Sequence, residues 1–439
     1  MRSILALFVL SVTAHATELP APITDADYAF VRLDEARLGQ LLFYDPILSG
    51  NKTVACATCH HPDFGTSDGV SLSFGDGGIG LGPNRRVDPN NRPEQRIPRN
   101  APGLFNLGAH EFTVMFHDGR LEADASQPGG LRTPMDADMV AGFASVLSAQ
   151  TMFPVLSRDE MAGSYRENEI ARAVRQGRIT GEGGAWQMLS ARVAAVPGYA
   201  ERFVQVYPHI DGPPDIAFTD ISNAIAAFMA FEFRSDSAPF DAVLRGEASF
   251  EGAAATGAKL FYETAACATC HEGPFLTDHG FHAMGAPQIG PGKAASFETH
   301  QRDEGRFRVT GDPADLYAFR TPSLRNVAQT APYGHAGAHR DLAAFIAHHA
   351  DPKAGLAAYD RAQAVLPDYV ATDFEVLNDV VQVADIAARV DAPQITLSPG
   401  PGDIAALVAF LETLSDPVVL EGRLGVPPSV PSGLPVPKR

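Results

Sequence analysis

The chain is poor in cysteine, tryptophan and positive charge, and each shortage excludes a class of protein. Among 439 residues there are four cysteines, one tryptophan, and 34 basic residues against 52 acidic ones. Four cysteines are too few to scaffold a chain of this length with disulfides. The formal net charge of −18 argues against nucleic acid or anionic lipid as a partner. It is compatible with a basic protein partner, and equally with solubility alone.

Long hydrophobic runs are also missing. A short apolar run at residues 4–12 follows Arg2 and precedes Ala14-His15-Ala16, which has the A-x-A form of a cleavage site. The run is too short to span a bilayer. We therefore expect residues 1–16 to be a signal peptide, and the mature chain to be periplasmic with no membrane span.

All four cysteines lie in two C-x-x-C pairs, each followed at once by histidine. The runs are Cys56-Ala57-Thr58-Cys59-His60 and Cys267-Ala268-Thr269-Cys270-His271. A Cys₄ zinc site would require both pairs to converge, and would leave both histidines unexplained. Covalent haem c explains every residue, because two thiols bond the vinyl groups and the histidine binds iron. The sequence therefore predicts two haem c groups.

Helical periodicity dominates the rest of the chain. Short amphipathic helices are expected at residues 38–44 and 257–262, before each haem motif, and longer ones over 219–234 and 403–415. Strand-like alternation is scarce, so the expected fold class is mainly α.

The segments that precede the two haem motifs, residues 38–44 and 257–262, are similar in sequence. This similarity suggests two cytochrome-c-like haem domains related by duplication. We expect an N-terminal domain at residues 17–235 and a C-terminal domain at 236–439, with the linker near 235–240. Residues 65–102 are rich in Gly, Pro, Asn and Asp and predict a long irregular loop. The Pro-rich tail after Asp416 is expected to lie extended along the surface.

Several other stretches form a recognisable set. They are Arg99-Asn100-Ala101-Pro102, Phe116-His117-Asp118-Gly119-Arg120, Gln150-Thr151-Met152-Phe153-Pro154, Thr321-Pro322-Ser323-Leu324-Arg325-Asn326 and Thr330-Ala331-Pro332-Tyr333-Gly334-His335. Together with the haem motifs, this set resembles the bacterial di-haem cytochrome c peroxidases and their MauG-like relatives. The resemblance runs over most of the mature chain.

The resemblance implies that hydrogen peroxide binds at the first haem, with His60 as its only protein ligand in the active state. Gln150 and Glu160 would move a proton between the peroxide oxygens and stabilise the leaving hydroxide, with Pro154 shaping the pocket. Many family members cap the resting first haem with a loop histidine. Residues 62–97 contain no His or Met, so we predict a first haem that is open without prior reduction.

The second haem is bound by His271, and its other axial ligand is the more informative one. The family places Met there in peroxidases and Tyr in MauG-like proteins. Counted from Pro332-Tyr333, the position is His349, with His348 as the alternative if the helix is shifted by one residue. An imidazole in place of Met would lower the haem potential.

The resemblance also leads to expectations for the residue between the haems and for a calcium site. His117 stands where the family has a tryptophan between the haems, whereas the single Trp186 is expected to pack in a helix. The family's calcium ion would be held by the Asn100 side chain and the carbonyls of Thr330 and Pro332, since calcium prefers oxygen donors. Asn100 would equally suit a turn.

Some polar residues have plainer interpretations. Arg120 and Arg325 are candidate partners of haem propionates, or members of structural ion pairs. His339 has no motif around it and is expected at the surface.

Three functions remain open. A peroxidase would reduce hydrogen peroxide with electrons from a cytochrome c or a cupredoxin, and a MauG-like oxidase would modify Tyr or Trp of a partner protein. A non-catalytic electron carrier would need two six-coordinate haems, and the first haem lacks a second ligand candidate nearby. Dimers occur in the family, so a homodimer is a further expectation.

Overall fold

The computed structural model describes residues 19–294, 298–391 and 400–438, so the expected signal peptide lies outside the described residues. None of the helices in these ranges is long and apolar enough to cross a membrane. Helices outweigh the strands, which form three small antiparallel sheets ordered β1-β2, β3-β4-β5 and β6-β7. The prediction of a mainly α fold is confirmed.

The elements have the following bounds. The helices of the first half are α1 Leu33–Phe43, α2 Cys56–Cys59, α3 Val146–Gln150, α4 Glu169–Arg175, α5 Ala185–Ala194, α6 Pro197–Val206 and α7 Phe218–Glu232. Those of the second half are α8 Pro239–Leu244, α9 Gly252–Lys259, α10 Phe307–Thr310, α11 Leu342–Ala350, α12 Pro352–Ala357, α13 Glu375–Asn378, α14 Val380–Ala388, α15 Pro401–Glu412 and α16 Pro417–Glu421. The strands are β1 Gly78–Ile79, β2 Arg86–Val87, β3 Val114–Met115, β4 Leu121–Ala123, β5 Leu131–Arg132, β6 Phe281–His282 and β7 Phe319–Arg320.

The expected helices form, with shifted ends. The helix predicted at 219–234 is α7, which begins at Phe218 because Asp220 accepts a hydrogen bond from the backbone N–H of Ala217 (2.9 Å). The helix predicted at 403–415 is α15. The helix expected at 257–262 begins earlier, as α9, and its last residues continue as a π-helical turn, Leu260–Thr264.

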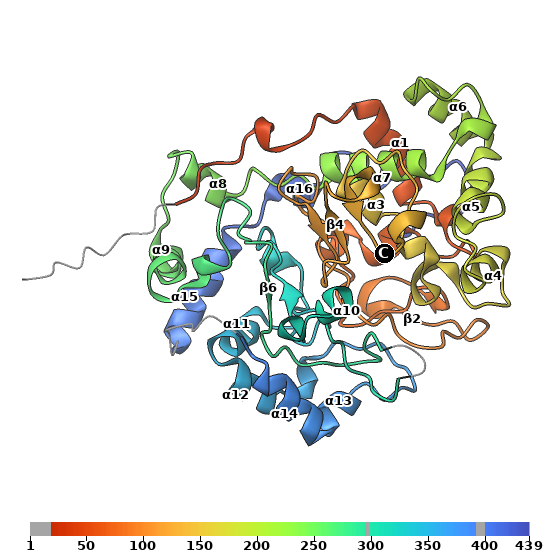
Figure 1. Ribbon diagram of the computed structural model, residues 1–439. Helices are drawn as coiled ribbons and strands as arrows, with labels where there is room; N and C mark the ends of the chain where they lie inside the picture. The colour runs from red at the N-terminus through yellow and green to blue at the C-terminus, as the bar shows by residue number, and fades with distance from the viewer. Residues whose placement is uncertain (1–18, 295–297, 392–399, 439) are drawn as a thin grey trace, which may run out of the picture.

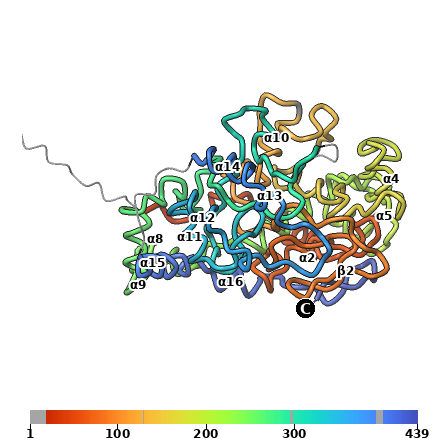
Figure 2. The backbone as a smooth tube through the Cα atoms, turned by 90° about the horizontal axis from the view of Figure 1, so that it is seen from below, coloured from red at the N-terminus to blue at the C-terminus, as the bar shows by residue number. Residues whose placement is uncertain are grey.

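Each haem motif is preceded by a helix that packs on a helix near the end of its own half. Helix α1 packs on α7, and α9 packs on α15. In the first pair, a Cβ on Gly39 would lie 1.8 Å from the carbonyl oxygen of Ala224; in the second, a Cβ on Gly257 would lie 1.9 Å from that of Ala406. Both crossings therefore require glycine. Figure 1 shows the two pairs on opposite sides of the molecule, and Figure 2 shows α9 and α15 side by side at one end.

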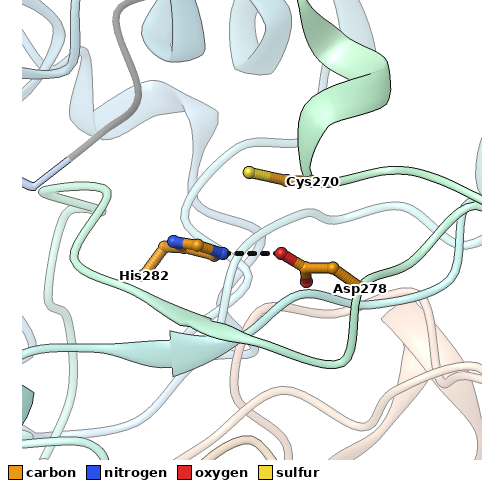
Figure 3. A group of neighbouring side chains, drawn as sticks. All are labelled: Cys270, Asp278 and His282. Carbon is orange, nitrogen blue, oxygen red and sulfur yellow. Dashed lines mark hydrogen bonds and ion pairs between the residues drawn. The ribbon is translucent and has the colours of Figure 1, made fainter.

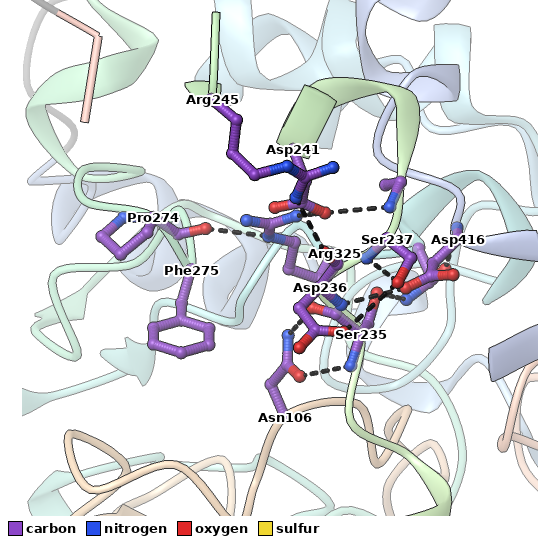
Figure 4. Close-up of polar contacts among 12 residues, drawn as sticks. Asn106, Ser235, Asp236, Ser237, Asp241, Arg245, Pro274, Phe275, Arg325 and Asp416 are labelled. Atoms are coloured by element: carbon purple, nitrogen blue, oxygen red, sulfur yellow. Dashed lines mark hydrogen bonds and ion pairs between the residues drawn. The ribbon is translucent and has the colours of Figure 1, made fainter. Parts of the chain in front are cut away.

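Two large hydrophobic clusters follow this division. The first surrounds the aromatic rings of Phe43, Tyr44 and Phe228, and the second surrounds those of Phe240 and Phe410. Between them the chain crosses a linker that is held by several hydrogen bonds (Figure 4).

The linker is held from both halves. Asn106 exchanges two hydrogen bonds with the backbone of Ser235, through its Oδ1 (2.7 Å) and its Nδ2 (3.0 Å). Asp416 accepts from the backbone N–H groups of Asp236 and Ser237 at 2.9 and 2.8 Å. Such a linker positions the halves rather than tethering them loosely.

The tail after Asp416 runs along the surface as expected, but a few of its apolar side chains are buried. Val419 and Val430 are only 3% and 6% exposed, and they pack into the first hydrophobic cluster. Gln40 donates to the carbonyls of Leu424 and Gly425, at 3.0 and 2.7 Å. The C-terminal segment therefore returns to the N-terminal half, because its scattered apolar residues find a core there.

Candidate functional site

The first Cys-His motif begins as a single helical turn, α2, and His60 ends it. Nδ1 of His60 lies 2.9 Å from the carbonyl oxygen of Thr66. Because a carbonyl only accepts, Nδ1 carries the proton, and Nε2 is the atom left to bind a metal. Burial lowers the pKa of His60, which keeps the ring neutral.

The second motif repeats this arrangement on a 3₁₀ turn, Cys267–Thr269. Nδ1 of His271 lies 3.1 Å from the carbonyl oxygen of Leu276, and burial lowers the pKa of His271 to about 4. Both histidines therefore meet the chemical requirements of an iron ligand. The neighbouring thiols are available for covalent attachment, since none of the four cysteines forms a disulfide.

Helix α11 presents the two candidates for the second axial ligand. Nδ1 of His349 lies 2.9 Å from the carbonyl oxygen of Phe345, which leaves its Nε2 for iron. Nε2 of His348 instead donates to the carbonyl of Met284 (3.0 Å) and is therefore protonated. The electrostatic influence of His349 reaches His271, whose pKa it helps to lower. This hydrogen bonding favours His349 over His348.

A histidine–carboxylate pair adjoins the second motif. Nε2 of His282 lies 2.9 Å from Oδ2 of Asp278, with Cys270 beside them (Figure 3). The Cys270 thiol and Asp278 raise the pKa of His282 to about 9. Once Cys270 forms a thioether, Asp278 is the partner that remains, so the group is part of the haem surroundings and not a separate metal site.

The residues assigned to peroxide chemistry lie on three successive short elements: a helix, a 3₁₀ turn and a π-helical turn. Helix α3 ends at Gln150, whose side chain makes no hydrogen bond to any other described residue. Pro154 begins a 3₁₀ turn, and Glu160 lies in a π-helical turn, Arg158–Ala162. Turns of this kind occur frequently at functional sites. Burial raises the pKa of the Glu160 carboxyl, although the nearby Lys293 and Arg120 oppose the shift.

The loop at residues 65–102 is irregular, as predicted, and it packs on the turn that carries Glu160. The backbone N–H groups of Gly75 and Asp76 donate to the carbonyls of Asp159 and Glu160, at 3.2 and 2.8 Å. Loop and turn are therefore joined by the backbone, and the position of Glu160 depends on the loop.

His117 lies between the two Cys-His sites along the chain and is half-buried. Its Nε2 lies 3.2 Å from the carbonyl oxygen of Asn100, and its own carbonyl accepts from the N–H of Arg320 (2.8 Å). Burial, and next the charge of Arg99, lower the pKa of His117 to about 3. His117 is therefore a neutral imidazole attached to both halves.

A buried ion-pair network centred on Arg99, whose charge reaches His117, was not predicted from the sequence. Arg99 bonds Asp303 through Nε (2.6 Å) and Nη2 (2.8 Å), and Asp118 through Nη1 (2.7 Å). Beside it, the ring of His335 stacks on Phe319 with 3.8 Å between centroids. Arg99 and Asp118 each lie in a sequence stretch that resembles the family, and this could have drawn attention to them. Nothing in the sequence indicates Asp303 as their partner.

The expected calcium ligands come from two segments that are joined. The backbone N–H of Asn100 donates to the carbonyl of His335 (2.9 Å), just after the Thr330–Pro332 segment. The side-chain Nδ2 of Asn100 donates to the carbonyl of Val70 (2.8 Å), so Oδ1 is the atom that remains for a cation. The carbonyls of Thr330 and Pro332 accept no hydrogen bond from any described residue. This set of oxygens fits a hard cation such as calcium.

The structure also tests the predictions for Arg120, Arg325 and His339. Both arginines form ion pairs, Arg120 with Asp118 (3.0 Å) and Arg325 with Asp241 (2.9 Å). The expectation that His339 lies at the surface is wrong. It is 5% exposed and its ring packs 5.3 Å from that of Phe345, because the residues around His349 enclose it.

Two C-x-x-C-H sites on one mainly helical chain, each with a neutral histidine, define a di-haem c-type protein. The family model described as "Di-haem cytochrome c peroxidase" matches residues 34–249. The "Methylamine utilization protein MauG" of Methylorubrum extorquens is 30% identical over 317 residues, which are 72% of this chain and 68% of that protein. The "Cytochrome c551 peroxidase" of Pseudomonas aeruginosa is 27% identical over 320 residues, 73% of this chain and 72% of that one.

A solved structure gives the same result for the fold. The chain superposes on "a MauG-like protein associated with microbial copper homeostasis" with a TM-score of 0.58 and 25% identity, over 94% of this chain and 97% of that one. The chain belongs to the di-haem cytochrome c peroxidase and MauG family. It is accordingly a di-haem enzyme with two haem c groups as cofactors.

Proposed function

We propose that the enzyme reduces hydrogen peroxide at the His60 site, with electrons that enter at the His271 site from a cytochrome c or a cupredoxin. When bound, haem supplies the redox-active iron. The observation that carries the proposal is the half-buried Glu160 on its π-helical turn, because desolvation raises the pKa of its carboxyl and so favours a group that can both take and return a proton.

The chain's own residues would then act as follows. Glu160 would accept a proton from the inner oxygen of peroxide and return it to the outer oxygen. The unpartnered Gln150 amide would donate a hydrogen bond to the departing hydroxide. Pro154 would limit the pocket's shape, and His117 would remain neutral beside it.

The test is to mix the oxidised, haem-loaded enzyme rapidly with hydrogen peroxide in the absence of reductant. An immediate absorbance change at the first haem supports an open site, in keeping with the absence of His and Met at residues 62–97. A change that appears only after prior reduction would contradict that part of the proposal.

The proposed electron-transfer site uses His271 and His349 as axial ligands. Imidazole on both sides lowers the potential relative to a His–Met pair. A donor of low potential would therefore suit this enzyme better than a donor of high potential.

A second function, oxidation of Tyr or Trp on a partner protein, is favoured by the same two departures. The missing loop histidine and the missing axial Met both resemble MauG-like proteins. Peroxide-dependent turnover of a reduced small cytochrome would support the peroxidase. Peroxide-dependent modification of a partner protein, without cytochrome turnover, would support the second function.

We further propose one calcium ion at Asn100, Thr330 and Pro332. The free Oδ1 of Asn100 and the two unpaired carbonyls support it. Metal analysis of the purified enzyme, before and after exposure to a chelator, tests the site directly.

The division into domains at 17–235 and 236–439, and their origin by duplication, are also proposals. The matched contacts of Gly39 on Ala224 and Gly257 on Ala406 support them. Because Val419 and Val430 pack with the first half, the tail would have joined the N-terminal core after the duplication.

We also propose that the enzyme is exported to the periplasm and forms a homodimer. N-terminal sequencing of the exported protein is expected to start near Thr17, and light scattering of the purified enzyme would give the oligomeric state.

A further inference from the structure

The only tryptophan of the chain is hydrogen-bonded to the segment that carries Gln150 and Pro154. Trp186 lies in the first turn of α5 and is 3% exposed. Its Nε1–H donates to the carbonyl of Met152 at 3.0 Å. Met152 lies between Gln150 and Pro154 in the chain, so the indole is attached to the segment that carries two of the proposed peroxide residues.

Trp186 is also the middle of a row of aromatic rings. Phe116 and Phe153 meet edge to face with 6.1 Å between centroids, and Phe153 meets Trp186 edge to face at 6.4 Å. On its other side, Trp186 lies nearly parallel to Phe218, again at 6.4 Å. Phe116 precedes His117, so the row runs from the segment between the two haem sites to the indole.

Indole is the most easily oxidised ring of this row, because a phenyl ring lacks an electron-rich heteroatom. The hydrogen bond to the Met152 carbonyl stabilises a positively charged indole, since the partial negative charge of the oxygen faces Nε1–H. The buried Tyr199 donates to Asp45 at 2.7 Å and so also has a proton acceptor, but it lies on α6 and makes no ring contact with this row.

We propose that Trp186 is an oxidisable relay of this enzyme, which gives up electrons to the peroxide site through Phe153 when no external donor is present. This role rests on the peroxide reduction proposed above. The first electron leaves the indole while its Nε1–H stays bonded to Met152. Loss of a second electron and addition of water, with release of two protons, gives hydroxytryptophan. The two electrons and two protons convert one hydrogen peroxide to two waters.

The experiment treats the oxidised, haem-loaded enzyme with hydrogen peroxide in the absence of a donor, and measures peroxide consumption and peptide masses in the same sample. The expected result is one added oxygen on the Trp186 peptide and none on the Tyr199 peptide. Adding ascorbate as electron donor should suppress the modification. Freeze-quenched samples should give an indole radical signal that is missing in Trp186→Phe, a variant that keeps a ring in the row.

The outcomes separate the two proposals. If peroxide is consumed while Trp186 stays unmodified and no indole radical forms, the relay is wrong and peroxide reduction stands. The same conclusion follows if Tyr199 is oxidised in its place. If peroxide is not consumed, the proposed function fails and the relay fails with it. The wild-type measurements decide the matter even if Trp186→Phe folds poorly.

Discussion

Arg99 and Asp303 form a buried bidentate ion pair, with 2.6 Å between Nε and Oδ2 and 2.8 Å between Nη2 and Oδ1. The two residues come from different halves of the chain, and His117 lies beside them. The pair therefore joins the two halves of the chain directly, through buried side chains. Its partner Asp118 ties the same guanidinium to the segment that carries His117.

Removal of this guanidinium should destabilise the enzyme strongly. In Arg99→Leu the carboxylates of Asp118 and Asp303 would lose their main buried partner, at a cost of about 3–5 kcal/mol in the free energy of unfolding. Chemical denaturation measures the change. The matched control is Arg158→Leu, which removes the pairs of an exposed arginine with Glu94 (2.6 Å) and Asp159 (3.0 Å) and should cost less than about 1 kcal/mol.

The same pair should make stability depend on pH in a defined direction. Burial raises the pKa of Asp118, but Arg99 and Arg120 overcome it and hold the value at about 2. A lowered pKa in the folded state gives stability that is present above the unfolded value of about 4 and is lost as pH falls toward the folded value. The stability difference between wild type and Arg99→Leu should therefore shrink between about pH 4 and pH 2. A difference that grows in this range would contradict the assignment.

The two glycine crossings predict a pair of equivalent mutational effects. Gly39→Ala and Gly257→Ala would each place a methyl group within 2 Å of a backbone oxygen, and each should destabilise its half by on the order of 3 kcal/mol. Gly402→Ala is the matched control, because it lies in α15 and has no atom within 4 Å of its Cβ position. Thermal unfolding of the three variants checks this. Tolerance of both crossing variants would argue against the proposed duplication.

The features that the sequence predicted are those encoded locally. The C-x-x-C-H motifs identify four thiols and two histidines as haem-binding residues without any knowledge of the fold. The spacing of apolar residues predicted the ends of α7 and α15 to within three residues. Long-range partners are different. Nothing near Arg99 indicates Asp303, and the apolar residues of the tail are too scattered to reveal that Val430 joins the first core. His339 was misplaced for the same reason, since its burial depends on neighbours folded around it.

Glu160→Gln tests the acid–base role. The amide keeps the shape but cannot take up a proton, so the rate of the peroxide reaction should fall by roughly 10²–10⁴. In the wild type, activity should rise with pH through the raised pKa of Glu160, because the carboxylate is the form that accepts a proton. Stopped-flow absorbance across pH measures both. Asp159→Asn, at the neighbouring position, should leave the rate of the carboxylate form nearly unchanged but shift the pH profile to lower pH, because the charge of Asp159 helps to raise the pKa of Glu160.

The calcium proposal predicts a loss that can be reversed. Asn100→Ala or treatment with a chelator should release one calcium ion and alter the spectra of both haems, because the backbone of Asn100 is hydrogen-bonded to His117 and to His335. Added calcium should restore the chelated wild type but not the variant. Retention of full activity without calcium would contradict a functional site.

The most direct test of the account is the electron paramagnetic resonance and optical spectrum of the oxidised, haem-loaded enzyme, recorded for the wild type, His349→Ala and His348→Ala. We predict one high-spin haem and one low-spin bis-imidazole haem in the wild type. The low-spin signal should disappear in His349→Ala and persist in His348→Ala, and peroxide should perturb the high-spin haem at once. Two low-spin haems that do not respond to peroxide would contradict the account and favour an electron carrier.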